Sequence, residues 1–191
     1  MLEVGACGAE AAALDSELLV QFEIRHEFDA PLDAIELAMM SPELGPLLGE
    51  TLTSLESVQP TEHKVDEHEF RRVWRFQARA PLKILSGYNI TREMMTWDEH
   101  SVYRRRDHTA DWFVVPRGES APDAPWRRHF AAEGTYQLDP LADGRTRRTV
   151  TGDLAVHLRL IGPIVERIAV GELRKAYEAK ASALRRLCSL A

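Results

Sequence analysis

The chain has 191 residues, of which 45% are hydrophobic and 28% are charged, a balance that fits one globular domain with a substantial core. No apolar run approaches the roughly 18 to 20 residues that cross a bilayer, and no basic segment followed by an apolar one indicates an export signal, so we expect a cytoplasmic protein. The two cysteines, Cys7 and Cys188, suggest neither a disulfide framework nor a metal-binding thiol pair.

The net charge of −6 is distributed unevenly along the chain. Residues 1–69 hold 16 acidic and 2 basic side chains, whereas residues 70–191 hold 14 acidic and 22 basic ones. A basic surface for nucleic acid or anionic lipid is one interpretation of this asymmetry. We favour the simpler one, in which acidic early elements lie beside basic later strands.

The first part of the chain predicts a tail, a strand and two helices. Residues 1–17 show no periodic pattern and are expected to form a loosely ordered N-terminal tail, which leaves 18–191 as a single domain. Apolar and polar residues alternate over 20–28, as in a strand with one buried face. Helical spacing follows over 32–41, after a proline, and a shorter helix is expected over 42–49.

Strand patterns then occupy about a hundred residues before a long helix closes the chain. The expected strands are 51–60, 68–79, 90–97, 101–115, 126–138 and 146–160, with turn residues at 59–61, 97–100 and 139–144. Two longer connections, 80–89 and 116–125, have compositions that suggest mobile segments controlling access to the interior. The last helix is predicted from Pro163 to about Leu190, with one apolar stripe.

This order of elements restricts the architecture. Short connections between successive strands require antiparallel neighbours. Each strand has one polar face, and only the helix from Pro163 is long enough to cover the apolar face of the sheet. We therefore predict an α+β fold in which a curved seven-stranded antiparallel sheet grips a long C-terminal helix, with two short helices after the first strand.

Three stretches resemble a known group. The segment "FEIRHEFDAPLDAIELAMMSPE" is similar to the opening strand and helix of the START-like, helix-grip superfamily, also called SRPBCC. The segments "TREMMTWDEHSV" and "GTYQLDPLADGRTRRTVTGDLAVHLRLIGPIVERIAVGELRKAYEAKA" resemble a branch of that superfamily known as a domain of unknown function. The resemblance covers residues 20–187 and implies the helix-grip fold. Superfamily members bind lipids, sterols, polyketides, plant hormones and quinones, and some are cyclases or co-chaperones.

The face of the sheet that points toward the last helix supplies the candidate ligand-binding residues. An apolar and aromatic wall with few polar groups suits a hydrophobic ligand, and the alternative is that the same side chains fill an ordinary core. The candidates are Phe22, Ile24, His26, Trp74, Phe76, Phe130, Tyr136, Leu154, Val156, Leu158, Ile168 and Tyr177. The pattern leaves open which faces carry Trp97, Tyr103 and Trp112.

Candidates for chemistry are few. His26 shares a face with large apolar residues and is either a general base, a donor to a ligand or a core histidine bonded to the backbone. Tyr136 and Tyr177 offer similar polar groups. The histidines of 63–68 match no zinc spacing and are expected in a solvated turn, so we predict no metal. No phosphate loop, dinucleotide fingerprint or nucleophile elbow occurs, and no cofactor is expected.

Basic residues on the strands and the last helix allow two interpretations. Those on the strands are either a basic plate for anionic partners or partners of the acidic first strand, in which Glu23 or Glu27 pairs with Arg147 or Arg159. They are Arg71, Arg75, Arg79, Arg104–Arg106, Arg127, Arg128, Arg145, Arg147 and Arg148. On the helix, Arg174, Lys175, Lys180, Arg185 and Arg186 indicate a solvated face, or a surface for transient membrane contact.

These observations favour a non-enzymatic module that binds or carries a small hydrophobic ligand, of the lipid, sterol, quinone or polyketide kind, between the sheet and the C-terminal helix. One alternative is a cyclase or hydrolase on the same fold that uses a pocket His or Tyr. The other is a protein-interaction or co-chaperone-like module without a ligand. The arginines and the aromatic residues lie mostly on opposite faces, so nucleic acid is not expected as a partner.

Overall fold

A computed structural model describes residues 20–79, 82–83, 89–90, 96–117, 130–156 and 162–189. The strands are β1 (Val20–Phe28), β2 (Leu55–Val65), β3 (Glu69–Ala78), β6 (Thr96–Arg104), β7 (Thr109–Pro116), β8 (Phe130–Pro140) and β9 (Thr146–Val156), and β4 (Leu82–Lys83) pairs with β5 (Asn89–Ile90) in a separate ribbon. The helices are α1 (Leu32–Met40), α2 (Leu44–Thr51) and α3 (Gly162–Cys188).

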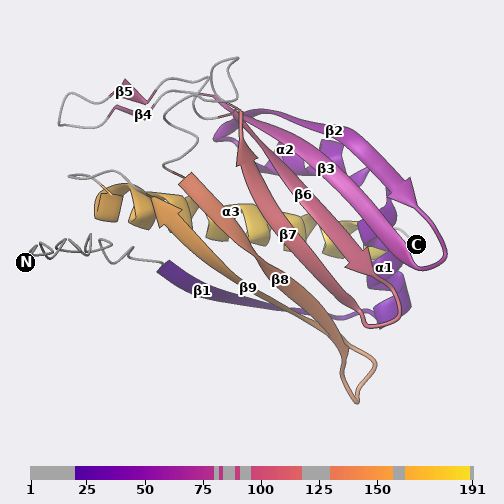
Figure 1. The fold of residues 1–191 in the computed structure, drawn as a ribbon. Helices are drawn as coiled ribbons and strands as arrows, with labels where there is room; N and C mark the ends of the chain where they lie inside the picture. Colours follow the sequence, from indigo (N-terminus) through magenta and orange to yellow (C-terminus); the bar gives the residue numbers. More distant parts are fainter. Residues whose placement is uncertain are drawn as a thin grey trace, which may run out of the picture.

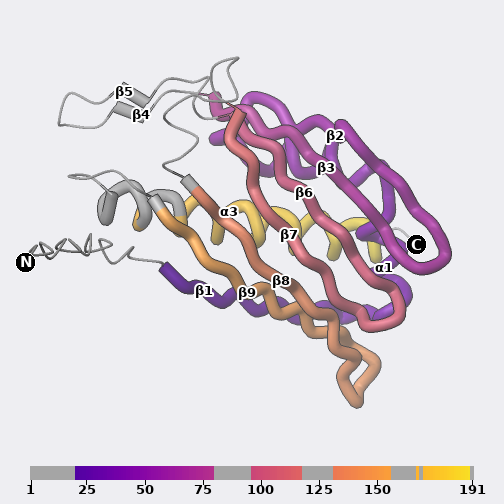
Figure 2. Tube along the Cα trace, in the orientation of Figure 1, coloured from indigo at the N-terminus to yellow at the C-terminus, as the bar shows by residue number. Residues whose placement is uncertain are grey.

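The main sheet has seven strands in the order β1-β9-β8-β7-β6-β3-β2, and every neighbouring pair is antiparallel. It curves around α3, which crosses its concave side, while α1 and α2 pack near the C-terminal end of α3 (Figure 1, Figure 2). The predicted α+β helix-grip fold is confirmed. None of the described helices combines the length and apolar character that crossing a bilayer requires.

The first and ninth strands show how alternation in the sequence becomes two faces of a sheet. The inward side chains of β1 are buried, except for the half-buried Val20 at its start, and the intervening ones are exposed, as the sequence pattern predicted. On the outer face, Glu27 accepts hydrogen bonds from Arg147 at 2.8 Å and from Arg145 at 2.8 Å. The predicted pairing between the acidic first strand and the basic last strand is therefore confirmed for Glu27.

Two glycines face each other on β8 and β9, and the one on β9 leaves room for an aromatic ring. Gly134 and Gly152 are register partners. A Cβ atom on Gly152 would lie 2.6 Å from Cζ2 of Trp112 and 2.8 Å from Cζ of Phe22, closer than real contacts allow. Gly152 therefore lets Trp112 lie directly against β9, where it contacts Phe22 with ring centroids 5.9 Å apart.

The turn predicted at 97–100 is wrong, because β6 runs straight through these residues. Two adjacent acidic residues suggested a turn, but each is paired inside the fold. Asp98 accepts hydrogen bonds from Arg75 and Arg117 on the outer face, and Glu99 accepts one from Lys180 on the inner face. The true turn lies between β6 and β7 and contains His108 at a φ of 54°.

The turn predicted at 59–61 is also wrong, because β2 continues through Pro60 to Val65. Since β2 is an edge strand, the missing N–H of Pro60 removes no essential ladder bond, and the register shifts between Pro60 and Glu62. The start of this strand also differs from the prediction, since α2 extends to Thr51 and β2 begins at Leu55. The predicted turn at 139–144 is confirmed by a Gly144 N–H to Leu141 carbonyl bond.

The two predicted access segments fall largely outside the described residues. Of 80–89, only the backbone of β4 and the first residue of β5 is described, and 118–125 lies outside. The same holds for 126–129 and 157–161, at the edges of two predicted strands. The role predicted for these connections stays a prediction.

Candidate functional site

The predicted ligand-binding residues that the structure describes all point between the sheet and α3. Phe22, Ile24, His26, Trp74, Phe76, Tyr136, Leu154 and Tyr177 are buried there. The side chains of Phe130, Val156 and Ile168, and Leu158 as a whole, lie outside the described part of the chain. Tyr103 and Trp112 are buried on the same side, and Trp97 stacks on Phe76 with ring centroids 5.4 Å apart.

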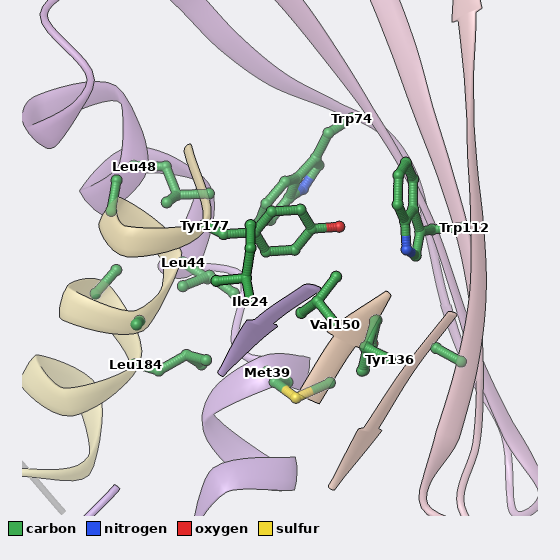
Figure 3. Packing of buried hydrophobic residues seen from close by; sticks show 14 of the residues in the cluster. Ile24, Met39, Leu44, Leu48, Trp74, Trp112, Tyr136, Val150, Tyr177 and Leu184 are labelled. Carbon is green, nitrogen blue, oxygen red and sulfur yellow. The ribbon is translucent and has the colours of Figure 1, made fainter. Parts of the chain in front are cut away.

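Aromatic rings from opposite sides meet at the centre of this interior. Tyr177 reaches from α3 toward Trp112 on the sheet, and Trp74 lies beside it (Figure 3). The rings of Tyr177 and Trp112 are 6.1 Å apart and arranged edge to face. The helix and the sheet are thus joined through aromatic contacts, which favour this geometry.

A cavity of about 20 Å³ lies next to these rings. Its wall consists of Met39, Leu44, Arg72, Glu99, Ser101, Trp112, Tyr136, Arg148, Tyr177, Lys180 and Leu184. Such a volume is about what one water molecule needs. The wall is also more polar than the sequence interpretation expected, because it includes four charged side chains.

Arg148 was expected on the outer face of the sheet, and that prediction is wrong: its side chain is buried. Its Nη2 atom donates to Nδ1 of His26 at 3.1 Å and to the carbonyl of Tyr177 at 3.2 Å. Burial lowers the pKa of the guanidinium to about 10, so the group stays protonated at neutral pH. Its Nε atom is buried and has no partner among the described residues.

Arg72 is also buried, on the inner face of β3. Its guanidinium carbon lies 3.7 Å from the ring centroid of Trp74, and Nη1 donates to the carbonyl of Met39 at 3.1 Å. Burial lowers the pKa of this group as well. The indole face and the carbonyl partly replace the water that the charge has lost.

Lys180 was expected on the solvated face of the last helix, and that prediction is wrong too, because its side chain is only 7% exposed. Its ammonium group donates to Oε1 of Glu99 and lies 4.7 Å from the ring centroid of Tyr177. Burial lowers the pKa of Lys180, and the Glu99 carboxylate opposes that change. The two residues form a buried ion pair between α3 and β6.

Two neutral donors in the cavity wall have no acceptor. The hydroxyl of Tyr136 and Nε1 of Trp112 are buried without a hydrogen-bond partner among the described residues. Burial raises the pKa of Tyr136 to about 12, although Arg72 and Arg148 oppose the change, so the hydroxyl keeps its proton. Buried polar atoms are nearly always bonded, and these two therefore need an explanation.

His26 is buried but is not part of the cavity wall. Because Arg148 donates to Nδ1, the proton of the neutral ring sits on Nε2, which faces Glu178 at 3.1 Å. Burial is the largest cause that lowers the pKa of His26, the charges of Arg148 and Arg185 add to it, and Glu178 opposes them. These surroundings favour the neutral ring, whose Nδ1 accepts a hydrogen bond from Arg148.

Sequence reasoning missed Arg72, Arg148, Lys180, Glu99 and Ser101 as members of the site. The signal for the two arginines was present, since Arg72 alternates with Phe70 and Trp74, and Arg148 lies two residues before Val150. Lys180 follows Tyr177 by three residues on one helix face. Glu99 and Ser101 were hidden by the misplaced turn.

Taken together, the sheet curved around one long C-terminal helix, the helix pair after the first strand and the interior lined from both sides define the class of helix-grip folds. Within that class the chain belongs to the family described as protein of unknown function (DUF2505), whose model matches residues 23–187. No curated protein matches the chain in sequence.

Solved structures share the fold at low sequence identity. The Zhui aromatase/cyclase from Streptomyces sp. R1128 superposes with a TM-score of 0.59 at 13% identity, over 90% of this chain and 94% of that chain. Norcoclaurine synthase from Thalictrum flavum gives a TM-score of 0.58 at 14% identity, over 98% of both chains. A START superfamily protein from Mycobacterium smegmatis gives 0.52 at 14% identity, over 87% of this chain and 98% of that chain.

Proposed function

We propose that this protein binds or carries a small, largely apolar organic molecule between its sheet and α3, without catalysing a reaction. The observation that supports this most is the cavity at the centre of the grip, whose wall combines aromatic and aliphatic side chains with a few convergent polar groups. Walls of this kind are typical of small-molecule sites. The volume of about 20 Å³ means that a ligand requires some lining side chains to move.

One fold neighbour supports small-molecule binding by a protein of this fold. One structure of norcoclaurine synthase, which superposes with a TM-score of 0.57 at 12% identity over 95% of both chains, is in complex with dopamine and hydroxybenzaldehyde. Two of the similar proteins are named as enzymes, the synthase and the aromatase/cyclase. For catalysis by His26 in this chain the geometry offers no support, because the ring does not line the cavity and is bonded to Arg148.

Native mass spectrometry of the full chain, purified from its own host, tests the proposal. We expect a bound organic molecule in a 1:1 complex, which denaturation and solvent extraction release for identification. Protein that carries no such molecule, and that binds none from a solvent extract of the host, would contradict the proposal.

A variant that fills the cavity connects binding to this site. Ser101 is buried in the wall, and Ser101→Leu should reduce the bound fraction at least tenfold, because the larger side chain occupies the space. Val102 is the next residue on the same strand and is not in the wall, so Val102→Leu is the matched control and should keep the ligand. Equal occupancy in both variants would place the ligand elsewhere.

A further inference from the structure

The cavity wall has more positive than negative charge. Arg72, Arg148 and Lys180 line it together with one carboxylate, that of Glu99. Glu99 accepts a hydrogen bond from Lys180 and also attracts the charge of Arg72. One carboxylate thus stands against three cationic groups among the lining residues, and a buried charge is costly unless it is paired.

The wall also has more donors than acceptors. Tyr136 Oη, Trp112 Nε1 and Arg148 Nε are buried without a partner in the described part of the chain. Arg72 makes one hydrogen bond to the described residues, through Nη1, and its guanidinium has further N–H groups to offer. Positive charge and unused donors around one small space are complementary to an anionic acceptor.

We infer that this cavity binds the carboxylate group of a small organic acid whose remaining part is apolar. Arg148 and Arg72 supply the charge, and Tyr136 and Trp112 donate hydrogen bonds to the carboxylate oxygens. A carboxylate can accept about four hydrogen bonds, which fits this set of donors. The inference rests on the proposed function and specifies the class of its ligand.

The rest of the wall fits the apolar part of such a molecule. Met39, Leu44 and Leu184 complete it beside the aromatic rings. Met39 belongs to α1, and its unbranched, flexible side chain adapts easily to a new neighbour. One buried water molecule bonded to the same donors is the competing explanation, because the volume alone would hold it.

Matched pairs of probes separate charge from apolar surface. We would titrate the full chain by calorimetry with decanoate and decanol, and with naphthoate and naphthalenemethanol. Each pair shares its apolar part and differs in the carboxylate. We expect the acids to bind at least about tenfold more tightly than the alcohols, since hydrogen bonds to a charged group contribute that much or more.

Variants on the two faces of β8 and β9 locate the effect. Tyr136→Phe removes one unpartnered donor without creating a gap, and Arg148→Met removes charge; each should reduce the advantage of the acids about tenfold or more. Arg147→Met is the control, because Arg147 lies next in the chain but pairs with Glu27 on the outer face. If Arg148→Met fails to fold, the conservative Tyr136→Phe still decides.

The outcomes separate this inference from the proposed function. Equal affinity for acids and alcohols would indicate a purely apolar site and refute the inference that the cavity binds a carboxylate. So would a higher affinity for the acids that persists in both Tyr136→Phe and Arg148→Met. If no probe binds, the molecule extracted from host-purified protein decides: a carboxylic acid supports the inference and a neutral compound refutes it. If no probe binds and the protein from the host carries no ligand, both proposals fail. The unpartnered donors would then bond only to a buried water molecule.

Discussion

The buried ion pair between α3 and β6 should dominate how the protein responds to a charge deletion inside the grip. The side chains of Lys180 and Glu99 are 7% and 13% exposed. Replacing Lys180 by Met keeps the volume but leaves the Glu99 carboxylate without its partner. Breaking a buried pair in this way costs about 3 to 5 kcal/mol, against a total stability of about 5 to 15 kcal/mol for a typical domain.

The lower end of that range applies here for two reasons. Lys180→Met also removes an ammonium group that burial has desolvated, which is why its pKa is lowered. The cost of keeping that charge away from water then no longer opposes folding. The Arg72 charge interacts with Glu99 and compensates part of the loss. We therefore expect Lys180→Met to cost about 3 kcal/mol, which for a chain of this length corresponds to a fall in Tm of about 6 to 12 °C.

Urea and thermal denaturation, followed by circular dichroism, measure this loss. The double variant Lys180→Met with Glu99→Gln removes both charges and should recover most of the stability, to within about 1 kcal/mol of the original chain. Lys175→Met is the control, because Lys175 pairs with Glu172 on the surface with side chains 70% and 45% exposed. That variant should lose less than about 1 kcal/mol.

Two results would refute this reasoning. One is a Lys180→Met variant no less stable than Lys175→Met, which would mean that water reaches Glu99 freely. The other is a double variant as unstable as the single one, since removing the second charge would then relieve nothing. In the double-mutant cycle we expect a coupling of at least about 2 kcal/mol between the two positions.

Further predictions concern acid stability and packing. Burial lowers the pKa of His26 below its usual 6.5. As the pH falls below about 6.5, His26 is therefore protonated more readily in the unfolded chain than in the folded one, and the folded state loses stability. His26→Asn should lose less stability between about pH 7 and pH 5 in urea titrations, and an unchanged pH dependence would contradict this. Gly152→Ala should cost about 1 to 3 kcal/mol and shift the near-ultraviolet signal of Trp112, because its Cβ would lie 2.6 Å from that ring. Gly49 lies in α2, and a Cβ atom added there would meet nothing within 4 Å. Gly49→Ala should therefore stabilise the protein by about 0.5 to 1 kcal/mol. Equal effects of the two substitutions on stability would contradict the packing argument.

The sequence predicted the architecture well because the fold depends on patterns that are local. The alternation over β1 and the long stripe of α3 are visible in any window of ten residues. The errors arose where distant residues decide. Asp98 and Glu99 suggest a turn locally, but partners on β3 and α3 hold them inside a strand.

The site was harder to predict than the fold, and the reason is chemical. Alternation places Arg72 on the buried face of its strand, but a charged residue is rarely buried, and Arg72 was not among the predicted site residues. The same holds for Arg148, which was grouped with exposed arginines. What makes both burials possible is the set of aromatic faces and carbonyls around them, which only the assembled fold reveals.

The same features that cost stability point to a role in binding. An unpartnered buried hydroxyl costs about 1 to 3 kcal/mol, so Tyr136→Phe should leave the chain as stable as before, or more stable. If Tyr136 merely filled a core, that change would have no other effect. If it donates to a carboxylate, the variant gains stability and loses affinity, and only a binding site predicts these opposite signs.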